Sequence, residues 1–310
     1  MSSKRAGAGY MWAVIVYLIV TLIMMVMVMV VPIELNLWAS SLIAQGAVIL
    51  PILAAALLTP APMLEQFPFK KIDFVTVLSA LLMTVVLYPA VVFVNAVSML
   101  YVPNRVEMLA EEFYQWPMWS VVLLIGVIGP LSEELCFRGF ILQNLRSSGR
   151  AAASVILSAV MFAFIHMNFN QASYAFLLGI FLALVVEASG SLWTSVIIHM
   201  FFNSFEVVLS YAGDAIREAM GAEGAELLQD IEGQAQIEAA LPVYAVMGAG
   251  GILLAYLLLK LMKSRRIARK QRFSSGVERG ESPKTEVLSF GPVVGLALAL
   301  VFMVETLFLY

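Results

Sequence analysis

Residues 117–145 read PMWSVVLLIGVIGPLSEELCFRGFILQNL, and this stretch decides both the class of the fold and the place to look for chemistry. It is long and apolar enough to cross a membrane, yet its second half carries Glu133, Glu134 and Arg138. A charged group costs roughly 2.5–3.5 kcal/mol at the centre of a bilayer on insertion scales, so such residues are rare in spans and mark functional sites. The segment therefore predicts a polar site within a membrane.

The whole chain has the composition of a membrane protein. Of its 310 residues, 62% are hydrophobic and 13% are charged, and the mean hydropathy is +0.93. Soluble domains hold about 45–50% apolar and about 25% charged residues. The single cysteine, Cys136, excludes an intrachain disulfide and a multi-cysteine metal site. No basic patch with stacking aromatic residues indicates a nucleic-acid partner.

We predict an all-α, polytopic integral membrane protein with about eight to nine transmembrane helices and a polar site at mid-membrane. A spanning helix needs about 20 predominantly apolar residues. The candidate spans are residues 11–31, 37–58, 73–100, 117–145, 151–168, 172–188, 191–210, 242–261 and 289–310.

The same pattern divides the chain into four parts. We expect N-terminal transmembrane helices in 1–114 and a core that carries the polar residues in 115–210. An acidic extracytoplasmic loop follows in 211–241, and it can be either a solvated loop or an amphipathic surface helix. The last part, 242–310, holds C-terminal transmembrane helices, a polybasic cytoplasmic linker and a flexible tether in 273–288.

The distribution of charge predicts the orientation of the chain. Lys and Arg collect in cytoplasmic loops, and here the basic pairs of the N-terminal half and the basic run in 260–272 fall on one predicted side. The opposite side receives the acidic 211–241 segment. We therefore expect a cytoplasmic N-terminus and an extracytoplasmic C-terminus, in a bacterial inner membrane. The basic run is expected to contact anionic lipid, and its members are Lys260, Lys263, Arg265, Arg266, Arg269, Lys270 and Arg272.

The two neighbouring carboxylates are expected to have different roles. Residues i and i+4 share a helix face, so Glu134 can pair with Arg138, in the favourable order with the acid N-terminal to the base. Glu133 is turned about 100° away and is free to accept and return a proton. The alternative is that all three form one buried ion-pair network that locks the helices. Gly129 and Pro130 are expected to break or kink the span.

The only two histidines lie in two further apolar segments. Phe162 precedes His166 by one turn, so its ring is expected to pack beside the imidazole. His199 and Asn203 form another i, i+4 pair, in which Asn203 can orient the imidazole or donate its amide to an oxyanion. At about 1.5 Å per residue, Glu133, His166 and His199 lie ~21, ~24 and ~15 Å from the cytoplasmic ends of their spans. They should meet near mid-membrane, although a core histidine and an interhelical hydrogen bond are the simpler interpretations.

Three motifs can be compared with known families. They are Glu-Glu-x-x-x-Arg at 133–138, Phe-x-x-x-His at 162–166 and His-x-x-x-Asn at 199–203. Together they resemble the motifs of the CAAX protease and bacteriocin-processing family (CPBP, or Abi) of intramembrane proteases. The resemblance covers about residues 115–210 and implies hydrolysis of a peptide bond in a membrane-associated substrate, which is lipidated in some relatives.

The resemblance also implies a role for each residue. Glu133 and His166 would activate a water molecule, and His199 with Asn203 would stabilise the tetrahedral oxyanion. Glu134 and Arg138 would organise the site, with Phe162 beside them.

Other protease chemistries fit the sequence less well. The chain has neither the His-Glu-x-x-His zinc motif nor the Gly-x-Ser-x-Gly nucleophile motif, and its three aspartates lie at or outside predicted span ends. No metal or cofactor is expected, because the metal-free mechanism gives Asn203 a role as an oxyanion donor. Zinc is the alternative, since Glu133, His166 and His199 could supply three ligands with water in the fourth position.

Two other functional classes stay open. A proton-coupled transporter could use Glu133, Arg138 and His166 as a proton relay, but it would predict a matching broken helix in a repeated half of the chain. Such a repeat is not evident in the sequence. A membrane scaffold that binds peptides without cutting them would carry the same residues.

Overall fold

The structure is a computed structural model that describes residues 2–30, 36–62, 66–108, 110–231, 234–273 and 288–307. Within these ranges the protein is all-helical, as predicted, and contains no β-strand. The elements are α1 (Ser3–Val30), α2 (Leu37–Leu57), α4 (Phe74–Met99), α5 (Arg105–Met108), α6 (Ala110–Tyr114), α7 (Met118–Val121), the π-helix η1 (Val122–Ile128), α8 (Gly129–Glu134), the π-helix η2 (Leu135–Ile141), α9 (Leu142–Arg146), α10 (Ala151–Phe164), α11 (Phe169–Ser189), α12 (Leu192–Ile231), α13 (Gln234–Phe273) and α14 (Phe290–Leu307).

Eight stretches of the described chain are long and apolar enough to cross a membrane, by length and composition. This number agrees with the predicted eight to nine spans of a polytopic membrane protein. The expected span in 151–168 is the exception, because α10 ends at Phe164 after 14 residues. Such a helix rises about 21 Å, less than the roughly 30 Å of a hydrocarbon core. The eight stretches are Ser3–Met27, Trp38–Leu57, Phe74–Met99, Met118–Arg146, Phe169–Ser189, Leu192–Gly221, Ala235–Ala268 and Phe290–Leu307.

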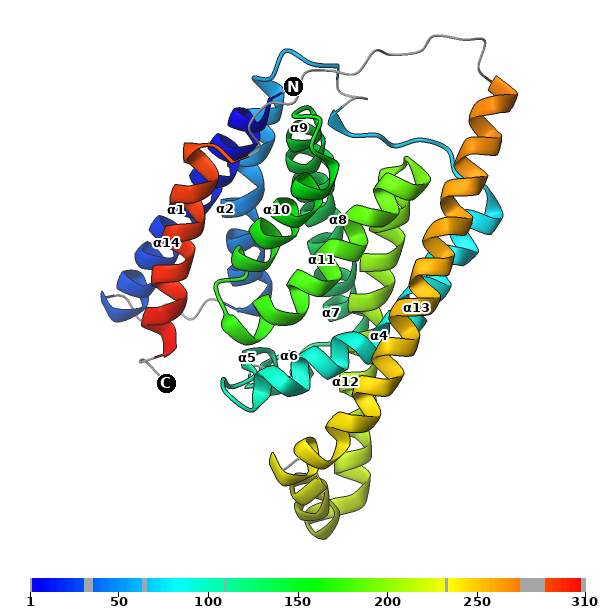
Figure 1. Ribbon diagram of the computed structural model, residues 1–310. Helices are drawn as coiled ribbons and strands as arrows, with labels where there is room; N and C mark the ends of the chain where they lie inside the picture. The colour runs from blue at the N-terminus through cyan, green and yellow to red at the C-terminus, as the bar shows by residue number, and fades with distance from the viewer. Residues whose placement is uncertain are drawn as a thin grey trace.

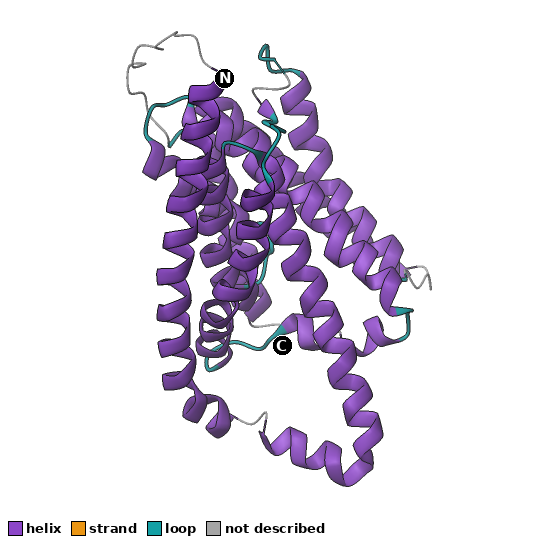
Figure 2. Cartoon of the chain, turned by 90° about the vertical axis from the view of Figure 1, so that its right-hand side faces the viewer, coloured by secondary structure: helices purple, strands orange, loops and turns teal. Residues whose placement is uncertain are grey.

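The helices pack in three groups around the span that runs from α7 to α9. Helix α1 packs against α2 and α14, α10 packs against α11, and α13 lies along α4. Helix α12 packs against η1 and so faces the middle of the central span. Figure 2 shows the helices mostly running side by side along the long axis of the molecule.

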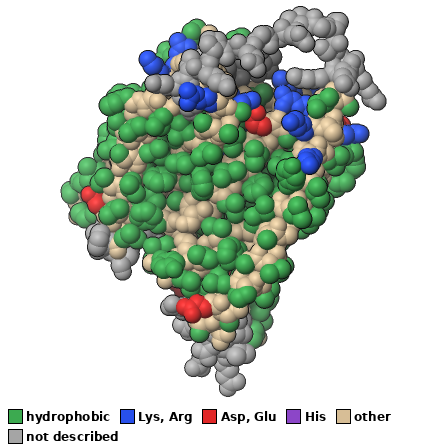
Figure 3. All heavy atoms as spheres, in the orientation of Figure 1, with side chains coloured by type: hydrophobic (Ala, Val, Ile, Leu, Met, Phe, Trp, Pro, Cys, Tyr) green, Lys and Arg blue, Asp and Glu red, His purple; other side chains and the backbone are tan. Residues whose placement is uncertain are grey.

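Basic side chains gather at one end of the bundle. Figure 1 places the starts of α1 and α14 and the end of α9 at this end, and the last described turn of α14 at the other. Figure 3 shows Lys and Arg at the same end and apolar side chains over the middle of the visible face, as expected for a surface in contact with lipid. We call this the basic end; its members include Lys70, Lys71, Arg146, Arg150, Arg265 and Arg266.

Ion pairs connect the helices at the basic end. Arg146 of α9 pairs with Glu187 of α11 at 2.7 Å, and Arg266 of α13 donates to the backbone carbonyl of Glu187. Arg265 lies 3.7 Å from Asp73, which caps the start of α4. The polybasic run of α13 is therefore in contact with α11 and with the start of α4.

The described residues of the segment 211–241 are helical. Helix α12 runs on to Ile231 with a break at Gly221, whose φ of 68° and ψ of −169° are not helical, and α13 begins at Gln234. The polybasic run, expected as a linker between the last spans, is helical and forms the last turns of α13, which continues to Phe273. Most of the expected tether, residues 274–287, lies outside the described residues.

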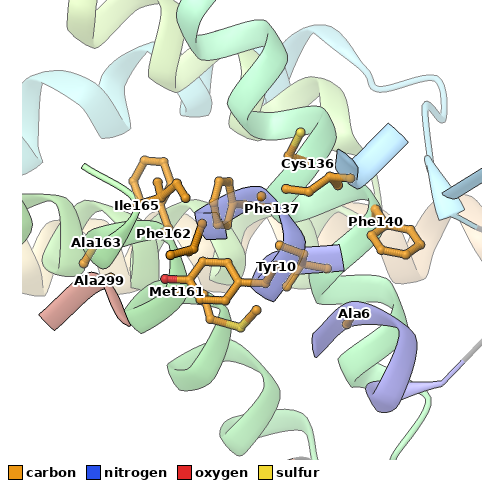
Figure 4. Packing of buried hydrophobic residues seen from close by; sticks show 14 of the residues in the cluster. Ala6, Tyr10, Cys136, Phe137, Phe140, Met161, Phe162, Ala163, Ile165 and Ala299 are labelled. Carbon is orange, nitrogen blue, oxygen red and sulfur yellow. The ribbon is translucent and has the colours of Figure 1, made fainter. Parts of the chain in front are cut away.

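An aromatic core fills the space between α1, η2 and α10. Tyr10, Phe137, Phe140 and Phe162 are each at most 1% exposed and belong to one hydrophobic cluster, shown in Figure 4. The Tyr10 and Phe137 rings lie edge to face with centroids 6.5 Å apart. This cluster closes one side of the polar residues of α8 and η2.

Candidate active site

The central span keeps its helical course through Gly129 and Pro130 by changing register, rather than by breaking as expected. Residues 122–128 form the π-helix η1, and the Gly129 N–H closes its last turn on the Leu124 carbonyl, five residues back. Pro130 has no N–H, so the next carbonyls in line lose their donor. Short π-helical turns of this kind are frequent at functional sites.

Side chains of α12 satisfy the carbonyls that Pro130 leaves free. Asn203 Nδ2 donates to the Ile125 carbonyl at 3.3 Å, which is the acceptor five residues before Pro130. Ser204 Oγ donates to the Gly126 carbonyl, four residues before, at 3.4 Å. A buried carbonyl without a partner costs about 1–3 kcal/mol, so these contacts fix α12 against η1. The second Asn203 N–H is not used by the Ile125 contact.

Glu134 and Arg138 form the expected i, i+4 pair, and both side chains are fully buried. Arg138 Nη1 donates to Glu134 Oε1 at 2.9 Å. Arg138 Nη2 also donates to the Gly179 carbonyl of α11 at 3.3 Å. The pair therefore connects α8, η2 and α11.

His199 uses the same carboxylate. Its Nδ1 lies 2.9 Å from Glu134 Oε1, and because a carboxylate can only accept, Nδ1 carries the proton. The opposite ring nitrogen, Nε2, lies 3.8 Å from Glu133 Oε2. His199 is 3% exposed, whereas the Glu133 side chain is 20% exposed. Of the two adjacent carboxylates, Glu134 is enclosed by protein and Glu133 is the one that water can reach.

The Phe162 ring connects the charged pair with both imidazoles. Arg138 Cζ lies over the ring, 4.0 Å from its centroid. The rings of His166 and His199 meet it edge to face with centroids 5.0 and 5.7 Å away. Phe137 meets it at 5.3 Å. The expected contact of Phe162 with His166 is present, and the ring also contacts Arg138 and His199, which the sequence did not predict.

His166 lies on the turn after α10 rather than in a span. Its Nδ1 donates to the Phe162 carbonyl at 2.8 Å, since a carbonyl can only accept, and Nε2 is left with its lone pair. The next residue, Met167, has a φ of 52°, in the left-handed region that non-glycine residues seldom adopt. Asn168 then caps α11 by accepting from the Gln171 N–H at 3.0 Å. The imidazole is thus held by the Phe162 carbonyl, and the turn that carries it is followed directly by the capped start of α11.

Two residues near this site were missed from the sequence. Ser132 Oγ donates to Gln45 Oε1 at 2.8 Å, which brings α2 beside α8, next to Glu133. Ser195 is fully buried one turn before His199, and its Oγ donates to the Leu192 carbonyl at 3.1 Å. Gln45 is the only amide in the predicted span 37–58, and Ser195 shares a helix face with His199. Both residues could therefore have been recognised from the sequence, as polar side chains within apolar spans.

The donor set fits a metal only in part. Both imidazoles have Nδ1 fixed by a hydrogen bond, an arrangement that suits metal-binding histidines. However, within the described ranges no group of three or more His, Cys, Asp or Glu side chains is close enough to hold one ion. His199 and Glu133 approach each other, but His166 does not complete the set. We therefore derive no step through zinc.

Comparisons with known proteins give two matches over the part of the chain that forms this site. Residues 115–205 match the family model described as Type II CAAX prenyl endopeptidase Rce1-like. UPF0177 protein YbdJ of Lactococcus lactis subsp. lactis (strain IL1403) is 28% identical over 102 residues, which are 33% of this chain and 44% of that protein. The alignment thus spans less than half of the relative's length. No solved structure matches the chain. The resemblance inferred from the three motifs is confirmed.

Proposed function

From the match of residues 115–205 to the CAAX prenyl endopeptidase family, we propose that this integral membrane protein hydrolyses a peptide bond within or beside the membrane. The observation that carries the proposal is the position of His199. Its imidazole is held between a buried carboxylate, Glu134, and an accessible one, Glu133. In this arrangement the accessible carboxylate can act as the general base for a water molecule, and the oriented imidazole beside it can donate to an oxyanion.

The proposed reaction begins with water. Glu133 removes a proton from the water while the lone pair of His166 Nε2 accepts a hydrogen bond from it. The water oxygen attacks the carbonyl carbon of the peptide, and the carbonyl π electrons move to oxygen. Glu133 then delivers the proton to the amide nitrogen as the C–N bond breaks, which gives a carboxylic acid and an amine.

The developing oxyanion is stabilised by α12 in this proposal. His199 acts with both ring nitrogens protonated, so that Nδ1 donates to Glu134 and Nε2 donates to the oxyanion. The free N–H of Asn203 is the second donor. Oxyanion donors are most effective when they are fixed before the reaction. The Ile125 contact of Asn203 and the Glu134 contact of His199 both support such rigidity.

Charge balance supports the doubly protonated His199. Arg138 and Glu134 neutralise each other, and His199 as an imidazolium neutralises Glu133. A neutral His199 would leave one net negative charge in the interior, which is costly. In this scheme Arg138, Glu134 and Phe162 position the reacting groups and take no proton.

The proposed substrate is a membrane peptide or protein, and a lipidated one fits the family description. Anionic lipid is proposed as the partner of the basic run at the end of α13. We place the basic end in the cytoplasm, because Lys and Arg collect in cytoplasmic loops. The N-terminus is then cytoplasmic and the C-terminus extracytoplasmic, and the bacterial inner membrane is the proposed location.

The test compares new peptide termini in membranes that hold wild type or Glu133→Gln at matched levels. Termini present only with the wild type would support the proposal and identify a substrate. Glu187→Gln is the matched control, because Glu187 is paired with Arg146 at the basic end, and it should keep the wild-type termini. A zinc chelator added to each membrane tests the metal-free mechanism, which predicts no change. The same termini in wild type and Glu133→Gln would overturn the protease proposal in favour of a scaffold or proton path.

A further inference from the structure

Gln45 brings a side-chain amide from α2 to the surroundings of the proposed general base, Glu133. The family match covers residues 115–205, so α2 lies outside it. Helix α2 packs against α8 and η2, and Gln45 is hydrogen-bonded there to Ser132, the residue before Glu133. Gln45 is therefore a neighbour of the proposed site that none of the three motifs includes.

The two ends of the Gln45 amide have different environments. Ser132 Oγ lies 2.8 Å from Gln45 Oε1 and 2.7 Å from the Gly129 carbonyl oxygen, and its one hydrogen is shared between these two acceptors. Gln45 Nε2 has no hydrogen-bond partner among the described residues. The carbonyl end of the amide is thus held by Ser132, and both N–H groups of its nitrogen are left to donate.

Gln45 Nε2 and the Glu133 carboxylate face one small space beside Gly129. A Cβ placed on Gly129 would lie 3.1 Å from Gln45 Nε2, 3.6 Å from the Leu124 carbonyl oxygen and 4.0 Å from Glu133 Oε1. The Glu133 side chain is 20% exposed and Gln45 is partly exposed, so water can reach both groups. Glycine at position 129 keeps this space open, because any side chain there would enter it.

The orientation of the amide agrees with its polar neighbours. If it were reversed, Oε1 would face the Glu133 carboxylate and the Leu124 carbonyl, and three acceptors would lie together without a donor. As it stands, Nε2 presents N–H groups to a space lined by these two acceptors. The amide is neutral, so it supplies a donor without changing the charge balance between Glu133 and His199.

We propose that Gln45 positions the water molecule that Glu133 activates, by donating an N–H from Nε2 to the water oxygen. The inference rests on the proposed peptidase function. In that reaction the water donates one hydrogen to Glu133 and the other to His166 Nε2, so its two lone pairs remain. One lone pair attacks the carbonyl carbon of the peptide, and a donor to the other fixes the orientation of the water.

The experiment uses purified full-length protein in lipid nanodiscs and a synthetic peptide that spans a cleavage site found by the comparison of termini. Gln45→Met keeps the length of the side chain and removes its N–H groups. We expect kcat to fall roughly three- to tenfold, as for the loss of one neutral hydrogen bond. KM should stay unchanged, because Gln45 contacts the water and not the peptide. Gly46→Ala is the matched control on the same helix, since its new Cβ would have no atom within 4 Å; it should keep both constants.

Gly129→Ala tests the same space with Gln45 in place. The new methyl group would enter the space that Nε2 and Glu133 face, and its nearest neighbour, at 3.1 Å, is the flexible end of the Gln45 side chain. The thermal midpoint should equal or exceed that of the wild type, since alanine favours a helix over glycine. The kcat should nevertheless fall as in Gln45→Met. A purely structural role of Gln45 would not predict a slower enzyme of undiminished stability.

Ser132→Ala removes the hydroxyl that holds Gln45 Oε1. It should lower kcat by less than Gln45→Met does. The double variant should be no slower than Gln45→Met alone, because Ser132 acts on the water through the amide.

The outcomes distinguish this inference from the proposed function. If wild type cleaves the peptide, Glu133→Gln does not, and either Gln45→Met or Gly129→Ala keeps the wild-type kcat, the positioning role is wrong and the peptidase stands. A raised KM at constant kcat in Gln45→Met would overturn the role in the same way, because the amide would then contact the peptide. Should Gln45→Met fail to fold, the kcat of Gly129→Ala decides. If wild type leaves the peptide intact, or Glu133→Gln cleaves it equally well, both proposals fail.

Discussion

Arg138 and His199 donate to the same oxygen of one buried carboxylate, Glu134 Oε1, each at 2.9 Å. The arginine comes from the central span and the histidine from α12, so Glu134 is the point at which the two helices are fixed to each other. Because Glu134 also sets which nitrogen of His199 carries a proton, the structural pair and the proposed catalytic residues form a single network. The two alternatives for these carboxylates, catalysis and helix locking, are therefore not exclusive.

Arg138→Ala should destabilise the protein strongly. The change leaves Glu134 charged, buried and without its main partner, at a cost of about 3–5 kcal/mol. We expect a large fall in yield and in thermal midpoint, measured by fluorescence-detected size-exclusion chromatography after heating. Arg146→Ala is the matched control, since Arg146 is 32% exposed and pairs with Glu187 at the surface. Its expected cost is about 0–1 kcal/mol. An Arg138→Ala protein as stable as Arg146→Ala would refute the structural role.

A double variant separates stability from chemistry. Glu134→Leu with Arg138→Met replaces both charges by apolar groups, which is often neutral for stability. The yield should recover relative to Arg138→Ala, whereas cleavage should stay low because His199 has lost its carboxylate partner. Recovery of full cleavage would show that Glu134 does not orient His199.

Phe162→Leu should lower the rate of cleavage more than its effect on stability explains. The Phe162 ring lies between the Arg138 guanidinium and both imidazoles, and small misplacements of reacting groups can cost a factor on the order of 100. Phe140→Leu is the control, because Phe140 is equally buried in the same cluster. We expect similar thermal midpoints for the two variants and a kcat at least roughly tenfold lower for Phe162→Leu alone. Equal kcat values for the two variants would show that Phe162 contributes only to core packing.

Gly126→Ala should push α12 away from the central span. A Cβ at Gly126 would overlap Ser204 Oγ and would lie 3.0 Å from the Ser204 Cα. This displacement of α12 should also weaken the contact of Asn203 with Ile125. The overpacked interface should lower the free energy of unfolding by about 1–3 kcal/mol. Gly46→Ala, in a helix with no atom within 4 Å of the new Cβ, should be neutral or up to about 1 kcal/mol more stable. Thermal midpoints and cleavage rates of both variants check this; a neutral Gly126→Ala would contradict the close approach.

The features predicted from sequence were those that depend on local spacing. The pairing of Glu134 with Arg138 and the contact of Phe162 with His166 both follow from the geometry of one helical turn. The apolar runs likewise gave the number of spans, because hydropathy and length suffice to recognise a spanning helix.

The features that sequence could not give depend on contacts between helices. The length of α10 depends on the turn at Met167, for which no glycine signals a left-handed residue. The contact of Asn203 with Ile125 requires knowing that α12 faces the carbonyls freed by Pro130. The shared use of Glu134 by His199 likewise depends on the packing of α12 against α8. A motif indicates which residues matter, but their partners emerge only from the packing.

Cysteine labelling in cells should report the proposed orientation. The only cysteine, Cys136, is buried, so wild type should stay unlabelled by a membrane-impermeant maleimide and provides the background. Ser147 is exposed at the basic end and Ala219 is exposed in the acidic part of α12. Because Lys and Arg collect in cytoplasmic loops, Ser147→Cys should react only after the cells are permeabilised. Ala219→Cys should react in intact cells. The reverse pattern would contradict the proposed orientation and place the basic end outside the cytoplasm.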